Sequence, residues 1–140
     1  MRPGIRTLVA VVAWLCAILC CLPEPGRTQA REPYPLAHNV YFSLKDSSEA
    51  ASDRLVESCR KYLQGHPGEL FFAAGTLVRE HAREVNDLDF NVSLHIVFRT
   101  KADHDRYQVA ERHKTFITQN QANWARVRVF DSYLKGPVLR

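Results

Sequence analysis

The residues of this chain that could carry out acid–base chemistry near neutral pH are its six histidines. A neutral imidazole can take a proton from a reacting group, and it is also a common metal ligand. No histidine pair has the spacing that puts two metal ligands on one helix face, and the cysteine–histidine patterns of structural zinc are absent from the sequence. His81, with Glu80 and Glu84, offers at most a weak surface site. We therefore expect no dedicated metal site.

Other kinds of catalytic group are poorly represented. Cys59 lies on the apolar stripe of a predicted helix, so we expect it to be a buried hydrophobic residue rather than a nucleophile. The other three cysteines lie in the first thirty residues. The sequence has no glycine-rich phosphate loop and no nucleophile-elbow pattern, which argues against nucleotide-dependent and serine-hydrolase chemistry. We expect no cofactor.

Length and charge set the remaining limits. The chain has 140 residues, enough for one compact domain. Its 19 Lys and Arg against 15 Asp and Glu give a net charge of +4. Nucleic-acid binding normally needs a clustered basic face, so this mild excess predicts no nucleic-acid partner.

The first thirty residues have the pattern of a secretory signal. Arg2 and Arg6 precede an apolar run over residues 8–22, and small residues at Thr28 and Ala30 suit cleavage after Ala30. We expect a secreted or periplasmic protein with no stable membrane anchoring after cleavage.

Two alternatives to cleavage stay open. An uncleaved membrane anchor is one, but a spanning helix needs about twenty apolar residues and this run is shorter. A lipoprotein anchor at Cys16, Cys20 or Cys21 is the other, although the residues before each cysteine are bulky.

The mature chain alternates between strand and helix patterns. Residues 38–45 alternate apolar and polar, which predicts a strand, and residues 48–64 carry apolar side chains at helical spacing. The remaining segments read as a strand at 70–78, a loop at 80–90, a strand at 91–100, helices at 101–112 and 115–120, and a strand at 126–134. The domain boundaries that follow are a signal at 1–30, an extended lead-in at 31–37, one domain at 38–134 and a tail at 135–140.

This order is β-α-β-β-α-β, the ferredoxin-like arrangement of the α+β class. It predicts a four-stranded antiparallel sheet with its helices on one face. The opposite face still carries Tyr41, Val97 and Phe130, with His95 beside them. Because an apolar face of that size is rarely left in water, and symmetric dimers are the commonest oligomers, we expect a homodimer.

Three segments of the domain resemble one known family, the stress-responsive A/B barrel domain (Dabb). They are the histidine-led first strand 38–45, the series Phe98, Tyr107 and His113, and the closing segment with Trp124 and residues 129–131. The resemblance covers residues 38–134 and implies a dimeric α+β barrel with a cavity between the sheet and the helices of each subunit.

The resemblance also implies roles for individual residues. The family includes olivetolic acid cyclase, a plant enzyme that cyclises a linear polyketide, and its catalytic tyrosine and histidine match Tyr107 and His113. His38 matches a further pocket histidine. A small apolar or aromatic ligand would then lie against residues of the cavity wall, namely Val40, Phe42, Leu94 and Trp124. In such a site His113 would act as the base and Tyr107 would stabilise the oxyanion.

One departure from the family bears on this site. The family usually has a His-Pro pair just before its last signature histidine, whereas this chain has Ala110 and Glu111 there. On an unbroken helix, six residues turn through about 600°, which leaves Tyr107 and His113 about 120° apart. The site therefore requires a bend near Glu111.

Three hypotheses of function follow. The first is a secreted, homodimeric protein that binds a small apolar or aromatic molecule. The second is a cofactor-independent enzyme of the cyclase or lyase type that uses His113 and Tyr107. The third is a structural or stress-protective module.

Overall fold

The computed structural model describes residues 34–136, which lie within one compact unit spanning residues 32–140. The signal at 1–30, most of the lead-in and the end of the tail lie outside these described residues. The elements are β1 (Leu36–Leu44), α2 (Glu49–Leu63), β2 (Glu69–Thr76), β3 (Val92–Phe98), α3 (Lys101–Val109), α4 (Glu111–Asn120), the 3₁₀ turn η2 (Gln121–Asn123) and β4 (Trp124–Tyr133). Within residues 34–136, no helix is long and apolar enough to cross a membrane.

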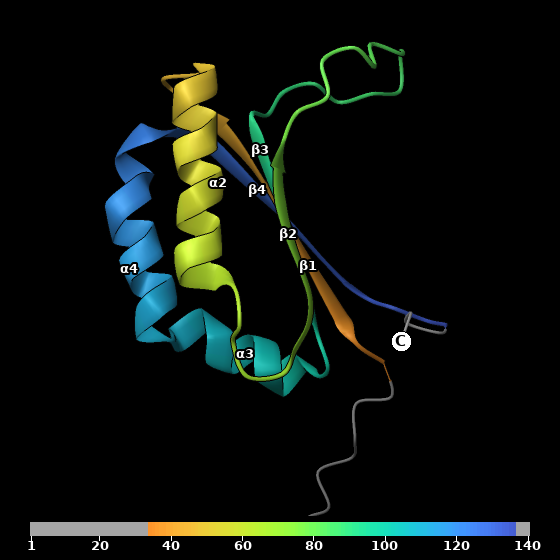
Figure 1. The fold of residues 1–140 in the computed structure, drawn as a ribbon. Coiled ribbons are helices and arrows are strands. Elements are labelled where there is room, and N and C mark those ends of the chain that lie inside the picture. Colours follow the sequence, from red (N-terminus) through yellow and green to blue (C-terminus); the bar gives the residue numbers. More distant parts are fainter. Residues whose placement is uncertain (1–33, 137–140) are drawn as a thin grey trace, which may run out of the picture. The chain divides into compact units, whose positions relative to one another are not determined.

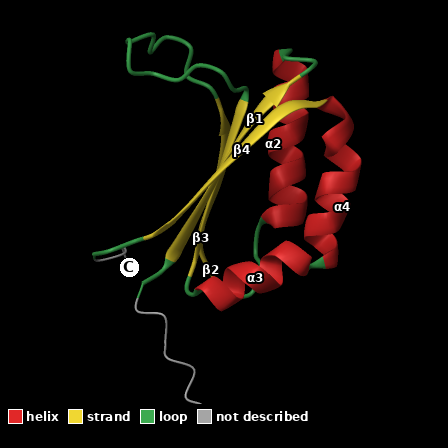
Figure 2. Cartoon of the chain, turned by 180° about the vertical axis from the view of Figure 1, so that it is seen from behind, coloured by secondary structure: helices red, strands yellow, loops and turns green. Residues whose placement is uncertain are grey.

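The four strands form one sheet in the order β2-β3-β1-β4, and all three strand pairs are antiparallel. Helices α2, α3 and α4 cover one face of the sheet (Figure 1), and the view from behind shows no helix of residues 34–136 on the other face (Figure 2). The predicted ferredoxin-like α+β fold is therefore confirmed. Strands β1 and β4 each begin two residues earlier than the alternation of apolar residues predicted.

The alternation along β1 places its apolar residues against the helices. Val40, Phe42 and Leu44 are buried, as is His38, while the residues between Val40 and Leu44 are only half-buried. The same pattern in β3 buries its alternate side chains completely or nearly so. Helix α2 packs against this face of the sheet and completes the core. Its residue Cys59 is 0% exposed, which confirms the prediction that this side chain is buried.

The helical region after β3 differs from the prediction. The prediction of one helix over 101–112 and another over 115–120 is wrong. Helix α3 ends at Val109 and α4 begins at Glu111, and Ala110 between them has extended backbone (φ −65°, ψ 140°). Side chains hold this break in place. His113 Nδ1 donates to the backbone carbonyl of Gln108 at 3.0 Å, and Arg112 donates to two backbone carbonyls at the end of α2. These contacts satisfy carbonyls that a helix end leaves without partners.

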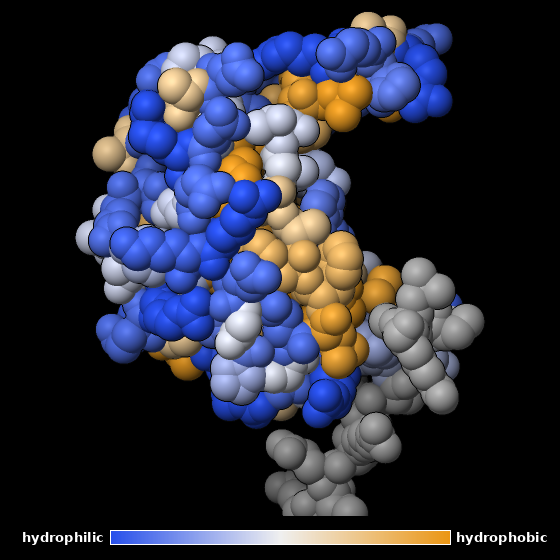
Figure 3. All heavy atoms as spheres, in the orientation of Figure 1, coloured by the Kyte–Doolittle hydropathy of each residue, from blue (hydrophilic) through white to orange (hydrophobic). Residues whose placement is uncertain are grey.

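A long loop, residues 77–91, projects beyond the sheet at one end (Figure 1). Its base is tied to the edge strand β4, because Arg126 pairs with Asp89 and Arg128 pairs with Asp87. The space-filling view shows apolar side chains gathered below this overhang (Figure 3). The loop and the open face of the sheet together enclose a groove of about 630 Å³.

Tyr41 is at the centre of the open face. Its ring makes edge contacts with Phe90, His95 and Phe130 at centroid distances of 5.0, 5.9 and 5.8 Å. Phe130 is nevertheless 54% exposed. The open face therefore presents an aromatic cluster that the loop covers only in part, because the ring of Phe130 stays accessible.

Candidate functional site

The candidate site is a cavity of about 230 Å³ between the sheet and the helices. Strands β1, β3 and β4 supply one wall, and α2, α3 and α4 supply the other. All seven site residues expected from the sequence line it: His38, Val40, Phe42, Leu94, Tyr107, His113 and Trp124. The fold thus brings them together, and their roles in binding or catalysis stay predictions.

The apolar end of the cavity is aromatic. The Trp124 ring lies 5.3 Å from the ring of Phe42 and 5.9 Å from that of Phe116. Val127 and Val129 extend the same wall along β4, and Val129 is half exposed. One end of the cavity therefore suits an apolar group, and its mouth opens beside the edge strand.

At the polar end of the cavity four histidines surround Tyr107, and two of them, His38 and His113, line the cavity itself. Ring centroids of His113 and His66 lie 4.6 and 4.9 Å from that of Tyr107, and those of His38 and His104 lie 5.8 and 6.3 Å from it. We call Tyr107 with these four residues the histidine cluster. It gathers four of the six histidines of the sequence around one buried phenol.

The break at Ala110 makes the closest of these contacts feasible. On a continuous helix Tyr107 and His113 would point in different directions, whereas the extended residue between α3 and α4 turns His113 back toward Tyr107. The bend that the site requires is present without the family's proline.

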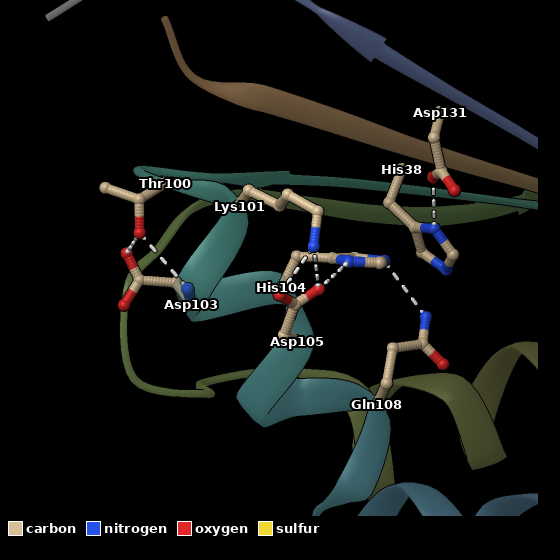
Figure 4. Close-up of polar contacts among 8 residues, drawn as sticks. All are labelled: His38, Thr100, Lys101, Asp103, His104, Asp105, Gln108 and Asp131. Atoms are coloured by element: carbon tan, nitrogen blue, oxygen red, sulfur yellow. Dashed lines mark hydrogen bonds and ion pairs between the residues drawn. The ribbon is translucent and has the colours of Figure 1, made fainter. Parts of the chain in front are cut away.

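Hydrogen bonds fix which nitrogen carries the proton in two of these rings. The carbonyl of Gln108 can only accept, so Nδ1 of His113 is the donor and its Nε2 keeps the lone pair. The carboxylate of Asp131 likewise accepts from Nδ1 of His38 at 2.7 Å (Figure 4). Both neutral imidazoles therefore have Nε2 available as a base or as a ligand.

Burial sets the charge of three members of the cluster, His38, Tyr107 and His113. It lowers the pKa of His38 and of His113 below the ordinary histidine value, more strongly than the Asp131 carboxylate and the Gln108 carbonyl raise them. Burial also raises the pKa of Tyr107, and nearby Cys59 and Glu69 act in the same direction. At neutral pH the imidazoles of His38 and His113 are therefore neutral beside the protonated phenol of Tyr107, which is the charge state that general-base catalysis with a hydroxyl donor needs.

Sequence reasoning missed three polar residues near the cavity. His104 stands three residues before Tyr107, a spacing that shares a helix face, so this signal was available. Asp131 shares a face of β4 with Val129 and pairs directly with His38 across the strands. His66 lies in the turn after α2, where no periodic pattern operates, and its Nε2 donates to the carbonyl of Tyr62.

One group of the described residues has the donor types and spacing to hold a metal ion. A single ligand atom from each of His38, His104 and Asp131 can be chosen so that all three lie within 4.8 Å of one another. The expectation of no metal site rested on spacing along the chain, and these three residues come from β1, α3 and β4.

The pKa shifts predict that the folded protein loses stability in acid. Burial lowers the pKa of His113 and of His95 in the folded state, while the unfolded chain keeps the ordinary value of 6.5. Above pH 6.5 both states are neutral at these rings; below it the unfolded chain takes up protons first, which favours unfolding. We expect the urea midpoint to fall between pH 7.5 and pH 5.0. The His113→Gln variant should show a weaker dependence, and an unchanged midpoint in the parent protein would contradict the prediction.

Comparison with known proteins places this architecture in a family. The family model described as the Stress responsive A/B Barrel Domain matches residues 36–134. The chain belongs to this A/B barrel family. Among curated protein sequences, no significant match to this A/B barrel protein is found.

Three solved structures illustrate the proteins that share this fold. A dabb family protein with a ferredoxin-like fold from Mesorhizobium loti is 19% identical, covers 74% of this chain and 99% of its own, and has a TM-score of 0.61. A hydroxynitrile lyase from Passiflora edulis is 15% identical over 76% of this chain and 99% of its own, with a TM-score of 0.62. A dimeric ferredoxin-like protein of unknown function from Jannaschia sp. is 23% identical over 71% and 99%, with a TM-score of 0.58. At these identities the likeness concerns the fold alone.

Proposed function

We propose that this A/B barrel protein is a secreted homodimer that binds a small apolar or aromatic molecule in the cavity of each subunit. The observation that carries the proposal is the composition of the cavity wall. Apolar side chains form most of it, and His38, Tyr107, His113 and Asp131 converge at one end. Small-molecule sites commonly combine an apolar wall with a few polar groups in this way.

The size of the cavity narrows the ligand class. An apolar protein cavity of about 150 Å³ is large enough to bind benzene. The cavity here, at about 230 Å³, suits a single substituted ring or a short branched chain rather than a fused ring system. A hydroxyl or carbonyl on that ring would find donors and acceptors in the histidine cluster.

The homodimer rests on the uncovered aromatic face. Tyr41 and Phe130 present apolar surface on the face without helices, and several solved structures with this fold are described as dimeric. A second copy placed on this face would bury both aromatic clusters and close the groove under the loop 77–91. Secretion rests on the signal pattern of residues 1–30 alone.

A cyclase or lyase activity is the second candidate, and the contact between Tyr107 and His113 favours it. With Nδ1 donating to the Gln108 carbonyl, Nε2 of His113 could remove a proton from a carbon next to a carbonyl group. The electron pair left behind moves onto the carbonyl oxygen, and the Tyr107 hydroxyl would donate a hydrogen bond to that oxygen. A hydroxynitrile lyase shares the fold, so this fold can carry a lyase reaction.

The test is a screen of single-ring aromatic compounds by ligand-observed NMR, with the purified protein and two variants. Val129→Trp places a large side chain in the half-exposed mouth of the cavity and should weaken binding at least about tenfold. Val109→Trp, at an exposed site on α3, is the matched control and should bind like the parent protein. The proposal would be overturned if no compound bound the parent protein, or if every compound that bound it bound Val129→Trp equally well.

The same compounds distinguish a binder from an enzyme. Each compound that binds is incubated with the protein and followed for conversion by mass spectrometry. Turnover that disappears in His113→Ala, while that variant keeps its affinity, would establish the cyclase or lyase function. If none of the compounds that bind is converted, the protein is a binding protein.

A further inference from the structure

Two members of the histidine cluster, His38 and His104, lie beside Asp131 and form with it a group of possible metal ligands. His104 does not line the cavity, yet its ring centroid lies 4.9 Å from that of His38. Asp131 stands directly opposite His38 on the neighbouring strand, and its Oδ1 is 2.7 Å from Nδ1 of His38. Two imidazoles and one carboxylate from three different elements thus meet at one point (Figure 4).

We propose that His38, His104 and Asp131 bind one divalent transition-metal ion of the zinc type. One nitrogen from each imidazole and one carboxylate oxygen form a donor set that Zn²⁺ accepts, and three protein ligands with a fourth, open position are the arrangement of catalytic zinc sites. His38 and Asp131 both line the cavity, so the fourth position would face the space that a small molecule enters.

The distances are close to those that a metal needs. Ligand atoms bound to zinc at about 2.0–2.2 Å lie roughly 3.3 Å apart in a tetrahedral site. The three donors here lie within 4.8 Å of one another, so binding requires the side chains to close by up to about 1.5 Å, a distance that side-chain rotations provide. Asp131 is partly exposed, which leaves it room to move.

The surroundings of His104 match those of a metal ligand. On one side Nδ1 of His104 lies 3.6 Å from a carboxylate oxygen of Asp105, which can orient the ring as outer carboxylates do in zinc sites. On the other side Nε2 of His104 lies 3.0 Å from the side-chain nitrogen of Gln108 (Figure 4). Gln108 therefore holds the position that the metal would take, and its amide must turn away when the metal binds.

The proposal gives Gln108 a role opposite to that of the three ligands. A ligand variant removes a metal–protein bond and should weaken binding. Gln108→Ala removes only the competing hydrogen bond, so metal binding should be kept or become tighter. If the histidine cluster only packed around Tyr107, the ligand variants and Gln108→Ala would not change the metal affinity in opposite directions.

The experiment titrates Zn²⁺ into the purified, metal-stripped protein by calorimetry, and follows Co²⁺ by its visible absorption. We expect one ion per chain in the parent protein. His104→Ala and Asp131→Asn should each weaken binding at least about tenfold, since changes even to outer-shell partners cost 10–100-fold. His81→Ala, in the exposed loop, is the matched control and should bind like the parent protein.

His104 lies on a helix and Asp131 is partly exposed, so both ligand variants are expected to fold, which circular dichroism checks. No saturable binding in the parent protein would overturn the proposal, as would a His104→Ala variant that binds as tightly as the parent. Because the titration uses the metal alone, its failure would leave the small-molecule function standing, and a failed ligand screen would leave the metal site standing.

Discussion

Replacing Phe130 with aspartate is expected to leave the protein monomeric at micromolar concentration. Phe130 is 54% exposed and stacks edge-on against Tyr41 at the centre of the open face. In the proposed dimer this position is buried, and a carboxylate there would be desolvated without a partner. Loss of a central aromatic anchor commonly costs about 2–4 kcal/mol, so we expect the dissociation constant to rise roughly 30- to 1,000-fold.

Sedimentation velocity measures this effect, and the Val109→Asp variant controls for added charge. Val109 is 65% exposed but lies at the end of α3, on the side of the sheet away from Phe130. The parent protein and Val109→Asp should sediment as dimers, and Phe130→Asp as a monomer with an unchanged circular dichroism spectrum. A Phe130→Asp variant that remains dimeric would show that the open face is not the interface.

The Phe98→Ala variant is expected to lose about 3–5 kcal/mol of folding free energy, the usual cost of deleting a buried phenyl ring. Phe98 is 0% exposed at the end of β3, and its ring lies 5.1 Å from the ring of Tyr107 and 5.6 Å from that of His104. The deletion would leave a void directly beside the histidine cluster. Urea denaturation at fixed protein concentration gives the change in free energy.

Phe98→Leu is the companion variant, since it keeps an apolar side chain in the same place. It should cost less than about 2 kcal/mol, because most of the buried volume is retained. If Phe98→Ala cost no more than Phe98→Leu, the ring would not be part of the core that positions Tyr107 and His104.

The fold could be predicted from the sequence because its strands alternate and its core is contiguous. A strict period-two pattern specifies which face of the sheet each side chain points to. In β1 the apolar residues stand at every second position, so only one orientation of the strand buries both Val40 and Phe42. The break at Ala110 could not be predicted in the same way. Nothing local to Ala110 disfavours a helix; the break is held by Arg112 and His113, which bond carbonyls outside α4.

The residues of the candidate site likewise fall into those that the sequence could identify and those that it could not. His38, Tyr107 and His113 were identified because they resemble a family signature, and Val40, Phe42 and Leu94 because they share the inner face of the sheet. His104 and Asp131 reach His38 only through the packing of α3 and the pairing of β4. Contacts between elements that are distant in the chain depend on tertiary structure, which periodicity does not describe.

The pairing of β4 with β1 also limits how this protein can evolve. Val127, Val129 and Asp131 line the cavity, while Arg126, Arg128 and Phe130 alternate with them on the other face. Loss of a single codon at the start of β4 would exchange the two sets, lining the pocket with guanidinium groups and turning Asp131 toward the open face of the sheet. Homologues should therefore differ in length in the loop 77–91 and keep the number of residues between Trp124 and Asp131 constant.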